Sequence, residues 1–146
     1  KTGAAREYLF NWDTAAYAAG QHTLRVVARD ASGASGSDEV TVNLVRISLS
    51  LSATRETTRA WSFERQYGLI QLAINCQGSP IGSGKLLRKS GSGSWQAINE
   101  ITAAELQSGS WSYQDKYLDK NTAYSYVIEI NDATGNLLAR SIEAGI

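Results

Sequence analysis

The chain has 146 residues, of which 42% are hydrophobic and 19% charged, and it contains 13 glycines, one proline and one cysteine. Fourteen basic residues balance fourteen acidic ones, which excludes the strong basic field that nucleic-acid binding requires. A single cysteine excludes an internal disulfide and a zinc framework, and no apolar run approaches the ~20 residues of a membrane-spanning helix. This profile favours an all-β fold of short strands joined by polar turns.

Three strand candidates occupy the first part of the chain, over residues 7–12, 22–30 and 39–44. The first is rich in aromatic residues, and the other two alternate apolar and polar side chains. Alternation with a period of two is typical of a strand with one buried face. These segments therefore predict a three-stranded antiparallel sheet within residues 1–46.

A set of residues at regular spacing runs through this block: Phe10, Trp12, Asp13, Thr14, Gly20, His22, Thr23, Leu24, Val26, Ala28 and Asp30. The set resembles the C-terminal half of a bacterial immunoglobulin-like repeat. A whole sandwich of this kind needs about seven strands, and three strands cannot bury an apolar face alone. The resemblance therefore implies that residues 7–44 pack on the next domain, on strands outside this block, or on a second copy of the chain. Among these we predict self-association, as a homodimer, through the exposed face.

The apolar positions change phase near residue 46. They are even-numbered over 40–44 and odd-numbered over 47–51, and a one-residue shift moves every side chain to the opposite face of a sheet. We interpret the shift as a boundary between a domain at residues 1–46 and a second at 47–146. No Pro/Gly-rich linker separates the two, so we expect a short and rather stiff joint.

The second block predicts about seven strands with turn signals between them. Strands are expected over 47–52, 69–75, 85–89, 95–101, from 111 to 113, 124–130 and 137–142, with a turn at 77–80, a corner at 115–121 and a hairpin turn at 131–136. Thr102 and Glu105 fit a capping box, which predicts one helical turn through Gln107. Regular strands of this kind predict an antiparallel β-sandwich.

A further set of residues lies at family-like spacing: Leu87, Arg88, Lys89, Trp95, Ile98, Tyr113, Asp115, Leu118, Asn121, Thr122, Tyr124, Tyr126, Gly135 and Ser141. This block resembles a fibronectin type III domain. Leu118 and Tyr124 match its tyrosine corner, which implies that the Tyr124 hydroxyl bonds a backbone group upstream. The tryptophan usual in the family's second strand is absent, and we expect Trp61 to fill that volume. We place both Trp61 and Trp12 in the core.

Residues that could carry catalysis are few. His22 is the only histidine and Cys76 the only cysteine, and neither lies in a nucleophile motif. The aspartates mostly flank turns without the spacing of a calcium loop; the loop between Asp30 and Asp38 is the best place to look for one. We predict no catalytic residues, no metal and no cofactor, and hence a protein that is not an enzyme.

Two tryptophans are the candidate ligand-binding residues. Trp95 and Trp111 each follow a Gly/Ser run, so both are expected to be partly exposed and could form an aromatic platform. Arg55, Arg59 and Arg65 form a local positive stripe, which either is a solvated strand face or serves acidic glycans or a membrane surface.

The sequence thus indicates a non-catalytic, extracellular β-sandwich module of a larger bacterial surface or secreted protein. Its expected role is spacing, adhesion or protein interaction. The expected partners are other domains of the parent protein, with a cell-surface protein or polysaccharide as further candidates. The alternative is a carbohydrate-binding accessory module of a secreted glycoside hydrolase, with Trp95 and Trp111 as its platform.

Overall fold

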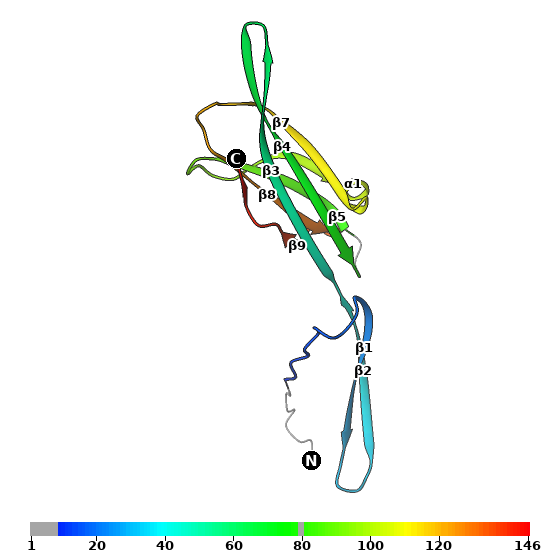
Figure 1. The fold of residues 1–146 in the computed structure, drawn as a ribbon. Helices are drawn as coiled ribbons and strands as arrows, with labels where there is room; N and C mark the ends of the chain where they lie inside the picture. Colours follow the sequence, from blue (N-terminus) through cyan, green and yellow to red (C-terminus); the bar gives the residue numbers. More distant parts are fainter. Residues whose placement is uncertain (1–8, 79–80) are drawn as a thin grey trace.

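The computed structural model describes residues 9–78 and 81–146 and shows an elongated molecule in which two β units follow each other end to end (Figure 1). The first unit is a hairpin of β1 (Gly20–Arg29) and β2 (Ser35–Leu44). The second is a sandwich of two antiparallel sheets that begins at Arg46. The predicted fold class, all-β with antiparallel sheets, is confirmed.

The sandwich is built from eight strands and one short helix. They are β3 (Arg46–Ala60), β4 (Phe63–Gln77), β5 (Ile81–Ser90), β6 (Gln96–Thr102), α1 (Ala103–Gln107), β7 (Ser110–Leu118), β8 (Tyr124–Asp132), β9 (Leu137–Arg140) and β10 (Ala144–Gly145). One sheet has the order β3–β4–β7, and the other has the order β10–β8–β5–β6 with β9 also beside β8. β9 pairs with residues 129–131 of β8 and β10 with residues 125–126, so the last edge strand is split in two.

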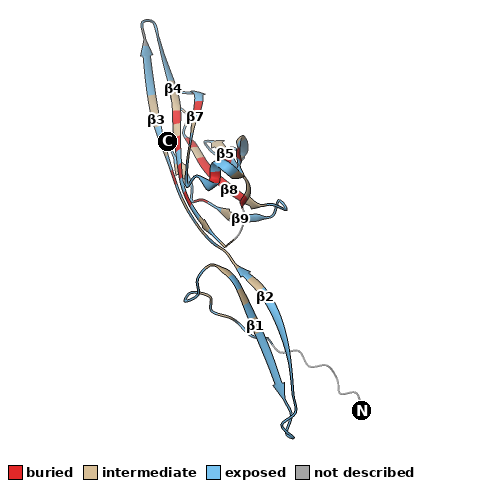
Figure 2. Cartoon of the chain, turned by 90° about the vertical axis from the view of Figure 1, so that its right-hand side faces the viewer, coloured by how far each residue is buried: buried red, intermediate tan, exposed pale blue. Residues whose placement is uncertain are grey.

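The core lies between the two sheets and nowhere else among the described residues. Its buried side chains come from both sheets and from α1, and include Leu51, Ile70, Leu72, Ile74, Leu86, Ile101, Leu106, Tyr126, Ile128 and Ile130. Figure 2 shows that buried residues are confined to the sandwich and that β1 and β2 have none. Strand alternation turns Ile70, Leu72 and Ile74 of β4 and Tyr124, Tyr126, Ile128 and Ile130 of β8 inward to this core.

The expected helical turn is present at Ala103–Gln107. The Thr102 hydroxyl accepts a hydrogen bond from the Glu105 amide, and the Glu105 carboxylate accepts one from the Thr102 amide at 2.8 Å. The capping box is therefore confirmed. The helix places Leu106 in the core, where it contacts the end of the sandwich.

Two of the expected segments differ from the observed ones. β3 and β4 have 15 residues each and pair along their whole length, from Arg46↔Gln77 to Ala60↔Phe63. Residues 53–67 therefore form the outer half of one long hairpin. β7 continues to Leu118, where the sequence pattern predicts a corner from residue 115.

The expected three-stranded partial sheet is not found among the described residues, where the first unit has the two strands β1 and β2. Residues 9–12 of the expected first strand have no strand pairing, and residues 7 and 8 lie outside the described part. Trp12 is half-buried outside the core, with ring centroids 5.0 Å from Tyr17 and 5.4 Å from His22. The prediction that Trp12 is a core residue is wrong, because its ring packs edge-to-face on these local rings instead.

The joint between the two units is one residue long. Val45 lies between the end of β2 and the start of β3, and the side chains around it bridge the units. The Arg46 guanidinium donates to the Tyr17 carbonyl at 2.8 Å, and the Asn43 amide donates to the Gly78 carbonyl. Gly78 has a left-handed φ of 88°, and a Cβ there would lie 2.2 Å from the carbonyl oxygen of Leu44. Glycine is therefore required for this close approach.

Candidate functional site

The two tryptophans of the predicted platform lie in different sheets. Trp95 directly precedes β6. The Lys89 ammonium lies 4.7 Å and the Arg140 guanidinium 5.5 Å from the centre of its ring. Trp111 is in β7, stacks parallel to Tyr113 at 5.9 Å and packs against the core cluster. The structure therefore does not bring Trp95 and Trp111 together into one platform.

A shallow trough of about 530 Å³ lies on the outer face of the β3–β4–β7 sheet. Its lining includes the small or polar residues Ser50, Ser52, Gln71, Ala73, Ser110 and Ser112. Trp111 and Leu72 also line the trough, but both alternate toward the core side of their strands. The side chains that face outward into the trough are therefore mainly hydroxyls.

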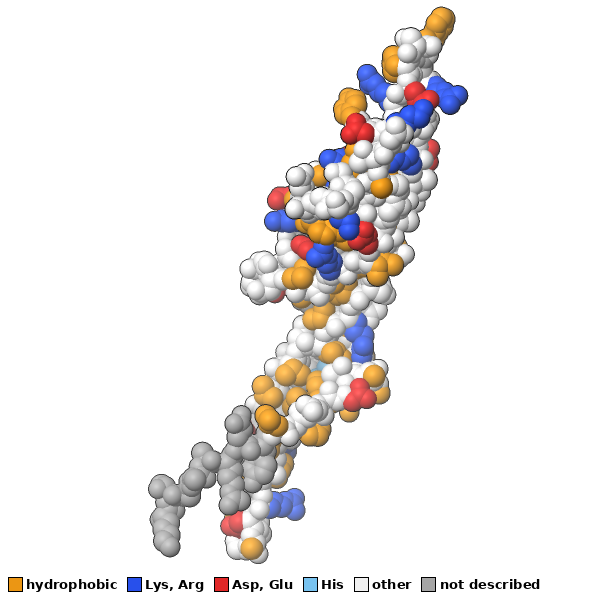
Figure 3. Space-filling model, turned by 90° about the vertical axis from the view of Figure 1, so that its left-hand side faces the viewer, with side chains coloured by type: hydrophobic (Ala, Val, Ile, Leu, Met, Phe, Trp, Pro, Cys, Tyr) orange, Lys and Arg blue, Asp and Glu red, His pale blue; other side chains and the backbone are white. Residues whose placement is uncertain are grey.

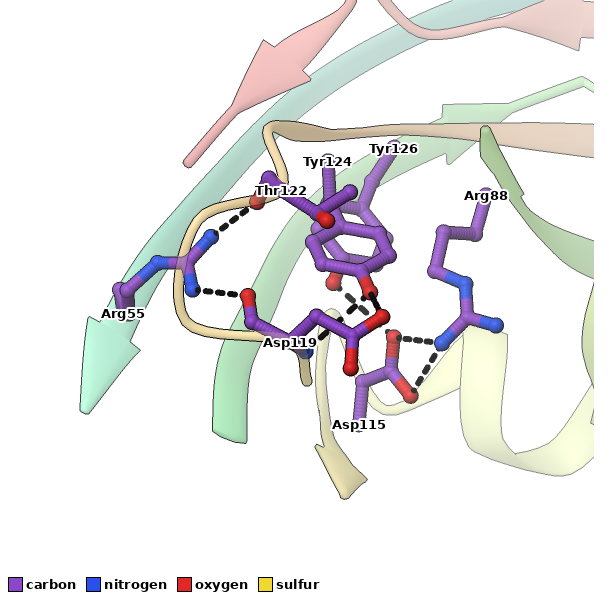
Figure 4. A network of polar contacts seen from close by, with 7 residues as sticks. All are labelled: Arg55, Arg88, Asp115, Asp119, Thr122, Tyr124 and Tyr126. Carbon is purple, nitrogen blue, oxygen red and sulfur yellow. Dashed lines mark hydrogen bonds and ion pairs between the residues drawn. The ribbon is translucent and has the colours of Figure 1, made fainter. Parts of the chain in front are cut away.

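A buried polar network connects the two sheets (Figure 4). Asp115 of β7 is 5% exposed and accepts two hydrogen bonds from the Arg88 guanidinium, at 3.0 and 2.9 Å. The Tyr126 hydroxyl donates to the same carboxylate at 2.9 Å. Burial, together with the nearby Asp115 charge, raises the pKa of Tyr126. The phenol therefore stays protonated and acts as a donor, and the network holds the sheets together.

The tyrosine corner lies beside this network. The Asp119 amide donates to the Tyr124 hydroxyl at 3.3 Å, so the expected bond to an upstream backbone group is confirmed. Arg55 of β3 donates to the carbonyls of Asp119 at 3.1 Å and Thr122 at 2.6 Å. Arg55 therefore holds the β7–β8 loop against the outer half of the long hairpin and is not a freely solvated member of a positive stripe.

The other sequence candidates have local structural contacts. His22 Nε2 lies 2.8 Å from the Ala18 carbonyl. Burial raises the pKa of the half-buried Cys76 thiol. Asp30 accepts hydrogen bonds from the Ser32 hydroxyl at 2.7 Å and from the Ala34 amide at 2.9 Å, and the Ser32 hydroxyl lowers the pKa of Asp30. These contacts make Asp30 a turn residue.

The most exposed aromatic group in the described residues lies at the tip of the β3–β4 hairpin. We define the hairpin tip as residues 57–66 together with residues 116–120, which span the end of β7 and the start of the loop after it. Trp61 is fully exposed, Tyr117 is 74% exposed and Phe63 is 54% exposed. The prediction that Trp61 fills the core is wrong, because Trp61 lies in the two-residue turn between Ala60 and Phe63, far from the facing sheet.

The backbone at the hairpin tip is unusual. Among the described residues, the non-glycine residues with left-handed φ are Trp61 at 37° and Tyr117 at 65°. A side chain at such a position costs on the order of 1 kcal/mol or more, and two-residue hairpin turns normally use Asn or Gly there. Tyr117 is the extra residue of a bulge in β7, because Lys116 pairs with Tyr67 and Leu118 with Gln66, and its ring points outward, 74% exposed. The stability of the fold therefore does not explain why Trp61 and Tyr117 occupy these two positions.

Cations lie among these rings. The Arg65 guanidinium sits 4.9 Å from the Phe63 ring centre and 5.5 Å from that of Tyr117, an arrangement typical of cation–π contacts. Glu64 pairs with Arg59 at 3.3 Å and with Lys120 at 3.4 Å, and Lys120 lowers the pKa of Glu64. The hairpin tip is therefore an exposed apolar apex with charged side chains directly behind it.

A local signal for this tip exists in the sequence. Residues 59–65 alternate Arg59, Trp61, Phe63 and Arg65 at odd positions, which can be interpreted as a strand with aromatic residues inside. The turn at Trp61–Ser62 lacks the Gly, Asn or Asp that usually marks a hairpin. The sequence pattern therefore does not predict this turn, and the structure locates it by the pairing of Ala60 with Phe63.

In the ranges that the structure covers, no helix is long and apolar enough to cross a membrane. Nor do three or more His, Cys, Asp or Glu side chains gather there at a position that could hold a metal ion. Comparisons of the chain with protein-family models, with curated proteins and with solved structures found no match.

Proposed function

We propose that this chain is a non-catalytic, extracellular β-sandwich module of a larger bacterial surface or secreted protein, and that it acts as a spacer and interaction unit. The observation that carries the proposal is the joint at Val45. Two β units are connected end to end by one residue, and a short linker without flexible residues holds its neighbours at a fixed separation.

The contacts around Val45 support a stiff joint. Gly78 lies against the Leu44 backbone, and Arg46 and Asn43 make hydrogen bonds that cross between the units. Bending at Val45 would break these contacts. The molecule would consequently transmit orientation as well as distance from one domain to the next.

The strand arrangement supports the resemblance to a fibronectin type III domain. The first, second and fifth strands of the sandwich form one sheet, and the others form the facing sheet. The tyrosine-corner bond between Asp119 and Tyr124 agrees with what the resemblance implies. Modules of this architecture commonly serve as cell-surface domains.

We expect Gly78→Ala to loosen the joint. The new Cβ would require the Leu44 carbonyl to move by roughly 1 Å to reach ordinary contact distance, starting from the 2.2 Å approach at this position. Small-angle X-ray scattering on the whole chain measures the result. The wild type should give a single, extended maximum particle dimension, and the variant should fit only a broader distribution of maximum dimensions.

Gly135→Ala is the matched control. Gly135 also has a φ of 90°, but a Cβ there meets nothing within 4 Å, so the substitution introduces the same backbone strain without a clash. Its scattering should equal that of the wild type. A Gly78→Ala profile that is also unchanged, or a wild-type profile already broad, would contradict the stiff-spacer proposal.

We also propose that the apolar face of the β1–β2 hairpin pairs with a second copy of the chain. Val26 is 69% exposed and Val40 is 55% exposed, and two strands alone are marginally stable. Sedimentation equilibrium should show a dimer that Val26→Lys abolishes. Thr23→Lys, on the opposite face of the same strand, should leave the dimer intact. A wild type that remains monomeric at high concentration would refute this pairing.

A further inference from the structure

We propose that the hairpin tip binds the surface of a lipid bilayer that contains anionic headgroups, with Trp61 and Phe63 entering the headgroup region. This inference goes beyond the spacer role and does not depend on it. It starts from the turn between β3 and β4, which lies at the far end of the molecule from β1 and β2 (Figure 1) and contains Trp61. Figure 3 shows hydrophobic side chains at this extremity, with basic and acidic side chains below them.

The length of the hairpin makes the tip accessible to a flat surface. β7 supports β4 as far as the pairing of Gln66 with Leu118, and the turn lies four residues beyond. At about 3.3 Å per residue, Trp61 projects roughly 13 Å past the edge of the sandwich. Since the headgroup region of one leaflet is only several ångströms thick, the apex can enter it while the sandwich stays in water.

The order of side chains along the hairpin matches the order of layers at a membrane surface. Trp61 lies in the turn at the outermost point, and Phe63 lies in the first strand pair behind it. Arg59 and Arg65 lie two to four residues from Trp61, and Lys116 and Lys120 lie at the base. Tryptophan prefers the interface between headgroups and acyl chains, and cations a few ångströms behind it meet lipid phosphates.

The basic residues of the tip favour binding to anionic lipid, and the acidic residues near them reduce this attraction. The cations of the tip are Arg59, Arg65, Lys116 and Lys120, and the acids near them are Glu56, Glu64 and Asp119. The Glu64 carboxylate already neutralises part of Arg59 and Lys120. Among the described residues Arg65 forms no ion pair and lies against two aromatic rings, so its charge is directed at the same surface as the rings.

The shape of the tip around Trp61 argues against a sugar platform at its apex, and the shallow hollows of about 360 and 270 Å³ lie behind it, beside Tyr117. A binding site for a small ligand is concave and has polar groups that converge on the ligand. Trp61 instead stands on a convex apex and is fully exposed. A protruding aromatic apex is suited to insertion, because a fluid bilayer needs no matching walls.

The test is co-sedimentation of the whole chain with vesicles of phosphatidylglycerol and phosphatidylcholine in equal amounts, compared with pure phosphatidylcholine. We expect partition onto the anionic vesicles only, weakened by added salt. Trp61→Gly should weaken it roughly tenfold, because apolar insertion is lost. Arg65→Gln should weaken it about fivefold, and Arg59→Gln by less, because Glu64 already neutralises part of the Arg59 charge. Trp61→Phe should retain most of the partition.

Ile142→Ser is the matched control, because Ile142 is also a large exposed apolar side chain, at 77%, but lies outside the tip. It should partition like the wild type. Trp61→Gly removes no core contact and relieves a left-handed backbone, so it should keep the wild-type far-UV circular dichroism. Equal partition of Trp61→Gly and wild type, equal binding to neutral vesicles, or no binding to either would overturn the proposal. Retention on an insoluble polysaccharide that requires Trp61 would instead assign the tip to a glycan.

Discussion

Asp115→Ala should destabilise the sandwich by about 3 kcal/mol, toward the lower end of what removal of one partner from a buried ion pair costs. Asp115 accepts hydrogen bonds from both Arg88 and Tyr126. The Arg88 side chain remains 28% exposed, so water can solvate part of the stranded charge. Urea unfolding followed by circular dichroism measures the loss as a shift in midpoint at unchanged slope.

Arg59→Gln is the control for this prediction. Arg59 pairs with Glu64 at 3.3 Å, but its side chain is 83% exposed, so the substitution should cost less than about 1 kcal/mol. A second comparison replaces the whole network with apolar residues, Arg88→Met, Asp115→Leu and Tyr126→Phe. It should recover much of the lost stability, because no charge remains unpaired and no buried hydroxyl loses its acceptor. An Asp115→Ala loss no larger than that of Arg59→Gln would show that the network adds little to stability.

Leu86→Ala should be similarly severe, with a loss of about 2 to 5 kcal/mol. Leu86 lies in β5 between β6 and β8 and is completely buried against the opposite sheet. Truncation leaves a cavity that the paired neighbouring strands cannot close. Thermal or urea unfolding of the whole chain provides the measurement.

The matched substitution is Leu137→Ala in β9, which removes the same atoms from a side chain that is 58% exposed. Its cost should be about 1 kcal/mol or less, because little apolar surface returns to water. If the two variants unfolded at the same denaturant concentration, the core would not lie between the two sheets as described.

The local chemistry of the sequence was sufficient to predict most of the sandwich. Strand-like runs between turn signals located β4, β5, β6 and β8, and the Thr102–Glu105 pattern located the helix. The spacing of Leu118 and Tyr124 predicted the tyrosine-corner hydrogen bond. These features depend on residues within a few positions of one another, so a single sequence contains the information.

Burial could not be predicted in the same way. Leu86 and Val26 both lie in strands expected from the sequence, yet Leu86 is buried and Val26 is 69% exposed. The difference is that a second sheet faces β5, while no described element covers β1. Whether an apolar strand face is buried depends on what packs on it, which is a non-local property.

For the hairpin tip, too, the sequence determined some features and the tertiary structure determined others. The sequence by itself determined that Trp61 is followed by Phe63 and Arg65 at alternating positions, and that the chain is all-β. Only the tertiary structure decided that Trp61 lies in a turn at the end of a long hairpin, and that Tyr117, distant in sequence, joins it through a bulge. It also decided that Asp115 meets Arg88, 27 positions away. Strand register and sheet order bring these residues together, and both result from the balance of contacts over the whole fold.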